Sequence, residues 1–367
     1  MHEASKILNK KITNYIVTFL QTKDIKMKLF NKLSLAVAIS ALCATTLVGC
    51  GGASNDKAAE KVLVRVSTNQ IETHPDTLAL EAFKKEIESK IGDKYQVQVY
   101  PNATLGANEK VLELIKQGSV QFLVLSTANV ESFDPIYAVF SMPYLFTAQD
   151  TYEKFIQKQD VIDQLNGNAK KNGFTTMTAF TAGTRNFYTR KPVKTVDDLK
   201  GLKIRVQAGP TNVAMVEAFG AAATPMSYGD VYSALQQGVI DGAENSELAL
   251  TDMKHGEVCK YFSYDMHQMC PDVLVGSTKF LDSLPEKDRA VFEEAARVAQ
   301  QVEFKLWHEH TQEAIDKAKK NMGVTFIDVD VNSFREKVLP IHQDLLSKNP
   351  AIKSLYEQID KVNKTGL

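Results

Sequence analysis

The segment GTRNFYTRKPVKTVDDLKGLKIRV occupies residues 183–206, and AFGAAATPMSYGDVYSALQQGVIDGAEN occupies residues 218–245. These two segments decide the fold, because Arg185 and Arg205 each stand among the apolar and β-branched neighbours that are typical of strands. Residues 210–219, which lead into the second segment, have the pattern of a helix, and the glycine that follows is a common helix terminator. Strands that alternate with short helices predict an α/β sheet.

The same alternation continues on both sides of these segments. Upstream, we predict strands over residues 62–66, 95–100, 122–125 and 174–180, and helices over residues 77–91, 108–117 and 151–171. Residues 133–146 hold two prolines and several aromatic residues, which favours a packed crossing segment over a helix. Downstream, we predict strands over residues 260–264 and 273–275, then a helix over residues 285–321 that would be about 55 Å long.

The composition is that of a globular protein. The chain has 367 residues, of which 44% are hydrophobic and 24% charged, enough for one large or two medium domains. The net charge is −1, but residues 1–50 hold seven Lys and two Asp or Glu, so the remainder carries 36 basic against 42 acidic residues. No basic patch stands out, so we expect no nucleic-acid partner. An anion would have to be held by a local site, since the overall field repels it.

Residues 27–49 predict an export signal. Two lysines precede an apolar run over residues 33–47, which is too short to span a bilayer comfortably. The run ends at Gly49-Cys50, and a polar linker follows, which together resemble a bacterial lipoprotein signal. Cys50 would then carry the lipid that anchors an extracytoplasmic, periplasmic protein to a membrane, with residues 50–61 as the lipidated linker. A plain signal peptide and a buried helix with an incidental cysteine remain alternatives.

Residues 1–26 do not fit a signal peptide. We therefore expect translation to start at Met27, with residues 1–26 an upstream extension. A genuine N-terminal segment is the alternative.

Two arginines and an amide suggest a carboxylate site. The planar fork of an arginine donates two parallel hydrogen bonds to a carboxylate. Arg185, Arg205 and Asn245 could therefore hold a small organic acid with roughly micromolar affinity, about 8 kcal/mol. The residues alone leave another possibility open: Arg185 could pair with an acidic residue at a domain surface, and Arg205 could extend to solvent.

The two quoted segments resemble those of a known family. The resemblance extends upstream to YPNATLGANEKVLELIKQGSVQF at residues 100–122 and MPYLF at residues 142–146. The family is that of the extracytoplasmic solute-binding proteins of TRAP transporters, of the dicarboxylate-binding type, and the resemblance covers most of residues 62–330. It implies a two-domain, periplasmic-binding-protein-like α/β fold with a ligand cleft between two lobes and a long bridging helix. It also implies a protein without enzymatic activity whose closed form docks on the membrane subunits of a sodium-driven transporter.

The resemblance also implies the ligand-binding residues. Arg205 in GLKIRV is expected to be the central carboxylate ligand, with Arg185 of the GTR motif and Asn245 of DGAEN beside it. Tyr228 is expected to line the cleft. Loops after two strands of the first lobe usually reach the substrate, which adds Asn69, His74, Ser126 and Asn129.

One departure from the family pattern bears on the ligand. The family often has proline after the asparagine of DGxEN, where this chain has Ser246 and then Glu247. A carboxylate near the anion site would repel a second carboxylate of the ligand, so Glu247 favours a hydroxylated monocarboxylate, such as a uronate or aldonate. C4-dicarboxylates and 2-oxo or hydroxy acids are the alternatives, and a ligand sensor for a signalling system is another.

Other function classes have no support in the sequence. There is no GxSxG, HExxH, GxGxxG or Walker motif, and no pair of carboxylates at a suggestive spacing adjoins the arginines. We therefore expect no catalytic residues, no cofactor and no metal site, and a monomer. His308 and His310 lie about 200° apart around a helix and could not share a metal. Cys259 and Cys270 could form a disulfide, but we favour free, buried thiols.

Combined with the resemblance, the element order predicts how the chain divides between the lobes. Lobe I would comprise residues 62–182 with residues 271–307, and lobe II residues 183–270 with residues 308–330. Residues 331–367 would form a C-terminal helical segment.

Overall fold

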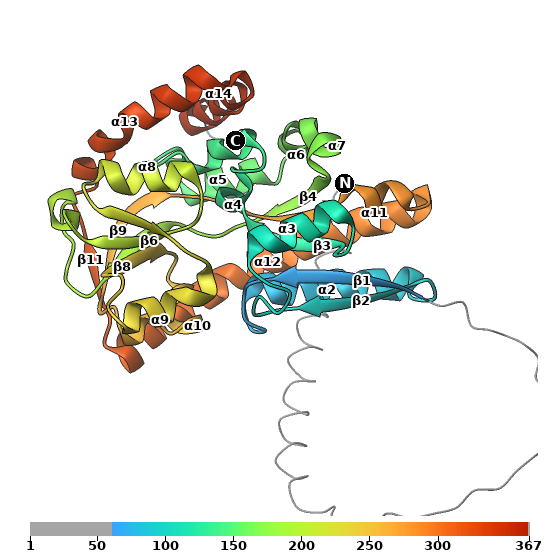
Figure 1. The fold of residues 1–367 in the computed structure, drawn as a ribbon, viewed down its shortest axis with the longest axis horizontal. Helices are drawn as coiled ribbons and strands as arrows, with labels where there is room; N and C mark the ends of the chain where they lie inside the picture. The colour runs from blue at the N-terminus through green and yellow to red at the C-terminus, as the bar shows by residue number, and fades with distance from the viewer. Residues whose placement is uncertain (1–60, 366–367) are drawn as a thin grey trace, which may run out of the picture. The chain divides into compact units, whose positions relative to one another are not determined.

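The structure, a computed structural model, describes residues 61–365 (Figure 1). The expectations for the N-terminal extension, the signal segment and Cys50 therefore lie outside the described residues. The described chain contains a sheet with strand order β2-β1-β3-β10-β4 and a sheet with strand order β11-β9-β5-β8-β6-β7. The prediction of a mixed α/β fold is confirmed.

The first sheet consists of β1 (Val62–Thr68), β2 (Tyr95–Tyr100), β3 (Phe122–Ser126), β4 (Phe174–Phe180) and β10 (Asp272–Ser277). Strand β1 runs parallel to β2 and β3. The connections through α2 (Pro75–Ile91) and α3 (Asn108–Gln117) carry the chain back, so that each of these strands starts at the same end of the sheet. Strand β10 is antiparallel to both β3 and β4. The strands that the sequence predicts here agree with the structure to within a few residues.

The second sheet consists of β5 (Arg185–Thr189), β6 (Lys203–Val206), β7 (Ala222–Pro225), β8 (Gly242–Asn245), β9 (Tyr261–Gln268) and β11 (Thr325–Asp328). Strand β6 is parallel to β7 and β8, and β5 is antiparallel to β8 and β9. Its short helices are η3 (Val196–Leu199), α8 (Pro210–Ala218), η4 (Tyr228–Asp230), α9 (Val231–Gln236), α10 (Leu248–Asp252) and η5 (His255–Glu257).

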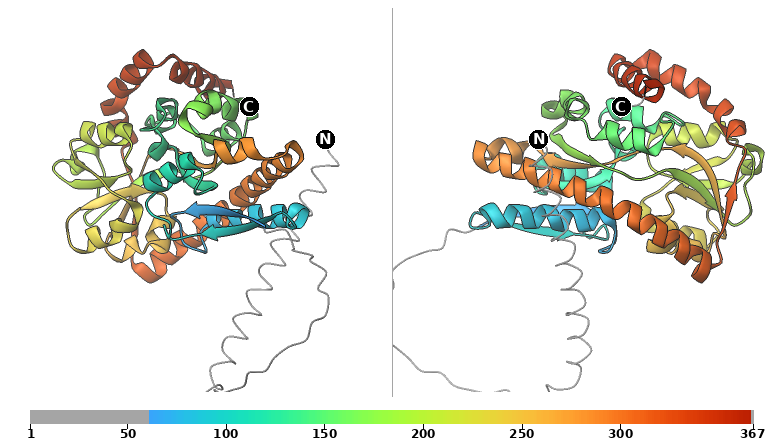
Figure 2. Two further views of the ribbon diagram at one scale, coloured as in Figure 1. Left: turned by 45° about the vertical axis from the view of Figure 1, so that its right-hand side comes forward. Right: turned by 180° about the vertical axis from the view of Figure 1, so that it is seen from behind.

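Three segments connect the two sheets. The chain passes from β4 of the first sheet to β5 of the second, and it returns from β9 to β10. The third connection is α12 (Glu286–Met322), which packs on α2 and β4 at one end and on α10 and η5 at the other (Figure 2). This helix confirms the predicted long helix, and its predicted inner stripe is buried: Phe292, Ala295, Ala299, Val302, Leu306 and Trp307.

Two predicted segments differ from the structure. Residues 151–171 are not one helix but α5 (Gln149–Ile156), α6 (Gln159–Leu165), η2 (Asn166–Asn168) and α7 (Ala169–Asn172). Helix α6 ends at Leu165, where the side chain of the next residue, Asn166, bonds both backbone groups of Thr176 in β4, at 2.8 and 2.7 Å. Within residues 133–146, the crossing segment contains a 3₁₀ helix, η1 (Pro135–Ser141), with proline in its first turn.

The remaining helices are α4 (Thr127–Val130), α11 (Thr278–Ser283), α13 (Val331–Lys348) and α14 (Pro350–Thr365). Cys259 and Cys270 are both free and buried, as the sequence analysis favoured. None of the helices within residues 61–365 combines the length and the apolar character needed to cross a membrane.

An aromatic cluster fixes α12 on the first sheet. Phe292 is fully buried and stacks on Phe122 of β3, with ring centroids 5.6 Å apart and an interplanar angle of 15°. Its ring also meets Tyr95 and Phe280 edge-on, at 5.4 and 5.5 Å. Such contacts contribute beyond what area burial alone provides, so Phe292 anchors the bridging helix on the first sheet.

We expect Phe292→Ala to lower the free energy of unfolding by about 3–5 kcal/mol, because it leaves a cavity among packed rings. Urea denaturation followed by circular dichroism measures this change. Leu339→Ala is the control, since Leu339 is 55% exposed and its loss should change stability by no more than about 0.5 kcal/mol. If Phe292→Ala and Leu339→Ala both changed stability by the same small amount, Phe292 would not be an anchor of α12 on the first sheet.

Candidate functional site

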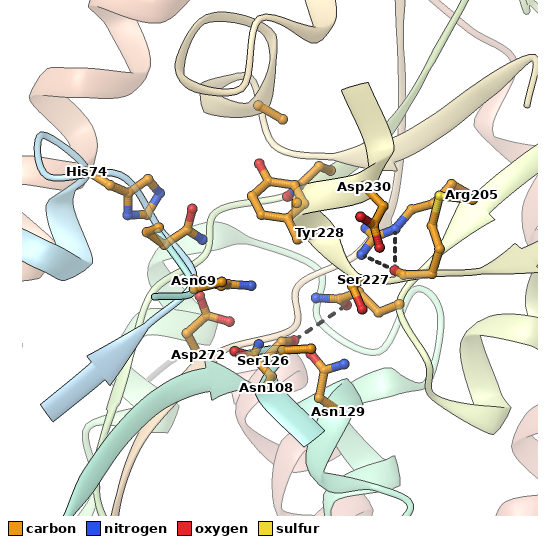
Figure 3. A pocket seen from close by; sticks show the side chains of 18 of the residues that line it. Asn69, His74, Asn108, Ser126, Asn129, Arg205, Ser227, Tyr228, Asp230 and Asp272 are labelled. Atoms are coloured by element: carbon orange, nitrogen blue, oxygen red, sulfur yellow. Dashed lines mark hydrogen bonds between the residues drawn. The ribbon is translucent and has the colours of Figure 1, made fainter. Parts of the chain in front are cut away.

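A cavity of about 260 Å³ is lined by residues of both sheets. Its walls come from strand ends and loops of both sheets, and Trp307 of α12 contributes to the lining. Figure 3 shows polar side chains from both sides converging on this space. The structure places all eight residues singled out from the sequence in its lining: Arg185, Arg205, Asn245, Tyr228, Asn69, His74, Ser126 and Asn129.

Arg205 on β6 is a buried cation that has no counter-ion among the residues that the structure describes. Its side chain donates from Nε and Nη2 to the Met226 carbonyl oxygen, at 3.1 and 2.9 Å, while Nη1 is buried and has no hydrogen-bonding partner. The guanidinium lies 5.6 Å from the centre of the Tyr228 ring. No salt bridge joins Arg205 to a carboxylate within residues 61–365. Burial lowers the pKa of Arg205, outweighing the attraction of Glu244, so an anion in the cavity would relieve an unfavourable burial.

Arg185 on β5 lies in the same wall but is already paired. Its Nε is 2.5 Å from the Glu244 carboxylate, Nη2 donates to the Glu244 carbonyl oxygen at 2.9 Å, and Nη1 donates to Asn245 Oδ1 at 3.1 Å. Burial lowers the pKa of Arg185, but Glu244 outweighs it and raises the pKa above its ordinary value. The alternative from the sequence is therefore half right: Arg185 does pair with an acid, but in the interior rather than at a surface, and Arg205 does not extend to solvent.

Glu244 belongs to a buried charge network behind the cavity. His267 Nε2 lies 3.5 Å from Glu244 Oε2, and its Nδ1 lies 2.8 Å from Asp265 Oδ2. Burial raises the pKa of Glu244, but Arg185 and His267 outweigh it and hold it at about 2. Burial lowers the pKa of His267, but Asp265 and Glu244 outweigh it and raise it to about 9. The positive charge of Arg185 is thus compensated by Glu244, whereas no described carboxylate compensates the charge of Arg205.

The opposite wall offers neutral hydrogen-bonding groups. Ser126 at the end of β3 donates to Gln207 Oε1 at 3.4 Å, which links the first sheet to the segment after β6. Asn129 Nδ2 donates to Glu109 Oε1 at 2.6 Å. Burial, with a contribution from His310, lowers the pKa of His74 to about 3, so this imidazole is neutral. Amides, hydroxyls and a neutral imidazole suit ligand hydroxyl groups.

Several residues that line the cavity were not expected from the sequence: Asn108, Glu109, Gln207, Ser227, Asp272 and Trp307. Gln207 directly follows β6, and Asp272 begins β10. Each is a polar residue at the end of a predicted apolar strand, and this pattern in the sequence could have indicated that both positions line the cavity. Trp307 was assigned to the packing stripe of α12, where it is buried, yet it also lines the cavity.

Glu247 does not stand at the anion site, contrary to the expectation that it repels a second carboxylate of the ligand. Glu247 is buried and hydrogen-bonded with Tyr264, and it is not among the residues that line the cavity. The carboxylates in the lining are Glu109, Asp230 and Asp272, while Ser246 also contributes to the wall. The acidic character that was attributed to Glu247 is thus supplied by other residues.

The fold and the site together define a two-lobe solute-binding protein. A cavity enclosed between two α/β units, with a buried cation free for a ligand anion, is the arrangement of a receptor that captures a small acid. Within residues 61–365 no group of three or more His, Cys, Asp or Glu side chains is placed to hold a metal ion.

The model of the family described as bacterial extracellular solute-binding protein, family 7, matches residues 66–349, and the chain belongs to this TRAP solute-binding family. The TRAP periplasmic solute-binding protein of Anaerococcus prevotii, solved with bound α/β-D-glucuronate, is 42% identical, with a TM-score of 0.82 over 83% of this chain and 99% of that one. A Sulfitobacter homologue, solved with bound β-D-galacturonate, is 28% identical, with a TM-score of 0.77 over 80% and 98% of the chains. The C4-dicarboxylate-binding periplasmic protein DctP of Vibrio cholerae is 31% identical over 72% of this chain and 78% of its own length.

The charge network predicts a pH dependence of stability. His267 has a folded pKa of about 9, raised from 6.5. Its contribution is therefore fully present below about pH 6.5 and is lost as pH rises through 9, on the order of 3 kcal/mol in total. We expect the free energy of unfolding, measured in urea from pH 6 to 10, to fall over this range by more in the unsubstituted protein than in His267→Gln.

His308→Gln is the matched control, because the His308 side chain is 59% exposed and lies outside the network. It should leave the slope of stability against pH unchanged. A His267→Gln protein with the same slope as the unsubstituted protein would show that His267 is not charged in the folded state.

Proposed function

We propose that this protein captures a hydroxylated sugar acid, with a hexuronate favoured, and delivers it to the membrane subunits of a TRAP transporter. The observation that carries the proposal is the unpaired guanidinium of Arg205, buried at the wall of the cavity. One carboxylate would satisfy the free Nη1 and neutralise the charge. The glucuronate and galacturonate bound to the Anaerococcus and Sulfitobacter homologues support this ligand class.

The charges around the cavity favour one carboxylate over two. Arg185 is matched by Glu244, so Arg205 is the cation left for a ligand among the residues that line the cavity. Glu109, Asp230 and Asp272 would repel a second carboxylate but can accept hydrogen bonds from hydroxyl groups. The dicarboxylate reading, suggested by the similarity to DctP of Vibrio cholerae, is therefore the second candidate.

The binding cycle we propose involves closure of two lobes without chemical change of the ligand. The lobes would be residues 62–182 with 271–307 and residues 183–270 with 308–330, and the protein would act as a monomer. A ligand that contacts both lobes stabilises the closed arrangement because the contacts exist together only there. The contact of Ser126 with Gln207 across the cavity is compatible with such a closed arrangement.

We also propose that the protein is held at a membrane by a diacylglyceryl group on Cys50, whose two acyl chains suffice for stable anchoring. In bacteria that produce the full chain, an alkyne-tagged fatty acid should label the protein, and the label should be lost in Cys50→Ser. Cys43→Ser is the control and should keep the label, because Cys43 lies within the signal segment. Labelling that persists in Cys50→Ser would exclude this anchor.

The ligand proposal is tested by calorimetric titration with D-glucuronate, D-galacturonate, D-gluconate, succinate and a 2-oxo acid. We expect a hexuronate to bind best and Arg205→Ala to lose at least about 2–3 kcal/mol of binding free energy, the loss of a charge-assisted buried contact. Small-angle scattering of the same samples should show a smaller radius of gyration with ligand and the mass of a monomer.

Lys203→Ala is the control for charge, because Lys203 is exposed on the same strand and does not line the cavity. It should bind like the unsubstituted protein. Unchanged affinity of Arg205→Ala would remove Arg205 from the site, and binding of succinate in preference to every sugar acid would establish the dicarboxylate reading. Ligand recovered unchanged after incubation is expected, and conversion of the ligand would instead indicate an enzyme.

A further inference from the structure

Asp272 is a carboxylate at the cavity wall that the arginines do not hold. It begins β10, is 91% removed from solvent, and lines the cavity together with Asn69 and Ser126 (Figure 3). Neither Arg185 nor Arg205 forms a salt bridge with it. Within residues 61–365, the hydrogen-bonding partner of its carboxyl group is another carboxyl group, that of Asp76.

Asp76, in the first turn of α2, is fully buried, and its side chain is hydrogen-bonded with that of Asp272. No N–H or hydroxyl group of the described chain donates to either of its carboxyl oxygens. His74 is 3.7 Å away, but its Nδ1 accepts a hydrogen bond from the Asp76 backbone N–H and so has no proton to donate. Two carboxylates cannot hydrogen-bond to each other unless one of them carries a proton.

The groups around this pair do not supply a compensating charge. Glu303 of α12 is fully buried and accepts from the Thr181 backbone N–H at 2.9 Å. Burial, with Asp272 and Glu153 of α5, raises the pKa of Glu303 well above its ordinary value, so this group supplies no positive charge. Burial raises the pKa of Asp76 well above its ordinary value, and Asp272 and Glu303 raise it further. Arg185 is the cation that acts on Asp272, and it is paired with Glu244. The other nearby titratable groups, Tyr152 and Cys270, are neutral when buried.

We propose that Asp272 is the residue that selects hydroxylated acids, by accepting a hydrogen bond from a ligand hydroxyl group, and that Asp76 positions it through a shared proton. This inference rests on the proposed function and names the part of the site that decides the ligand class. The proton donated by Asp76 occupies one lone pair of Asp272 and fixes its carboxylate plane. The other oxygen lone pairs remain available to the cavity.

The selectivity follows from charge and hydrogen bonding together. A ligand hydroxyl group satisfies the buried Asp272 carboxylate, whereas a second ligand carboxylate placed there would face a like charge in a poorly screened environment. The shared proton keeps the pair at one negative charge instead of two, which limits the repulsion of the single carboxylate that Arg205 is proposed to bind. Asp76 therefore acts on the ligand through Asp272, and we classify it as a positioning residue.

The selectivity is tested by titrating the unsubstituted protein and Asp272→Asn with D-glucuronate and with succinate. We expect Asp272→Asn to weaken D-glucuronate binding about 10- to 100-fold, the usual range for a lost charge-assisted hydrogen bond. Succinate binding should stay the same or become tighter, so that the ratio of the two affinities falls by at least about tenfold. A thermal unfolding midpoint confirms that each variant is folded, and Asp272→Ser replaces Asp272→Asn if the latter is not.

Glu217→Gln is the matched control, since Glu217 is an exposed carboxylate on α8 that does not line the cavity. It removes the same charge and should shift both ligands in the same direction, leaving the ratio unchanged. An unsubstituted protein that binds no sugar acid would refute the proposed function and the inference with it. An unsubstituted protein that binds D-glucuronate, with an unchanged affinity ratio in Asp272→Asn, would overturn the inference alone.

The role of Asp76 is tested by the pH profile of D-glucuronate binding from about pH 6 to pH 10, where the ligand stays ionised. We expect affinity to fall as the pair loses its shared proton, because a second buried negative charge then faces the anion. In Asp76→Asn the side-chain amide donates the hydrogen bond to Asp272 and does not titrate. The affinity of this variant for D-glucuronate should therefore not fall in this way as the pH rises. Loss of the proton of His267, whose pKa is about 9, affects both proteins alike. Profiles of equal shape, falling or flat, would overturn the positioning role.

Discussion

The buried ion pair between Arg185 and Glu244 is the interaction on which the rest of the site depends. It joins β5 to β8 in the middle of the second sheet, and His267 and Asp265 complete its hydrogen bonds from β9. Burying charges is costly unless they are paired and hydrogen-bonded. Because this network is nearly self-sufficient, the adjacent Arg205 has no partner within it, and its charge is left for a ligand.

The difference between the paired Arg185 and the unpaired Arg205 also explains the polar character of the cavity. A site with two free guanidinium groups would attract two carboxylates, whereas one free and one paired guanidinium attract one. The remaining lining, which includes Asn69, Ser126 and Gln207, then recognises groups that are uncharged but form hydrogen bonds. In the same way the proposed proton shared by Asp76 and Asp272 lowers the number of charges near the ligand without removing an acceptor.

The residues that line the cavity come from both sheets, so a movement of one sheet relative to the other would change the distances between these residues. Arg205 and Tyr228 belong to the second sheet, and Asn69 and Asp272 belong to the first. The covalent connections between the sheets are the segment from β4 to β5, the segment from β9 to β10, and α12. The aromatic anchor of α12 at Phe292 lies on the first sheet only. A ligand that contacts both walls is therefore positioned to couple its binding to their approach.

By itself the sequence determined the elements and the family. The strands around Arg185 and Arg205 and the long helix follow from local patterns, because strand and helix periodicities are properties of neighbouring residues. The eight expected site residues followed from the resemblance of the sequence motifs to a known family. The sequence did not reveal that Glu244 neutralises Arg185, that a helix ends just before Asn166, or that Asp272 meets Asp76, which stands far away in the chain. Only the tertiary structure decided these points, since burial and charge pairing depend on residues that folding brings together.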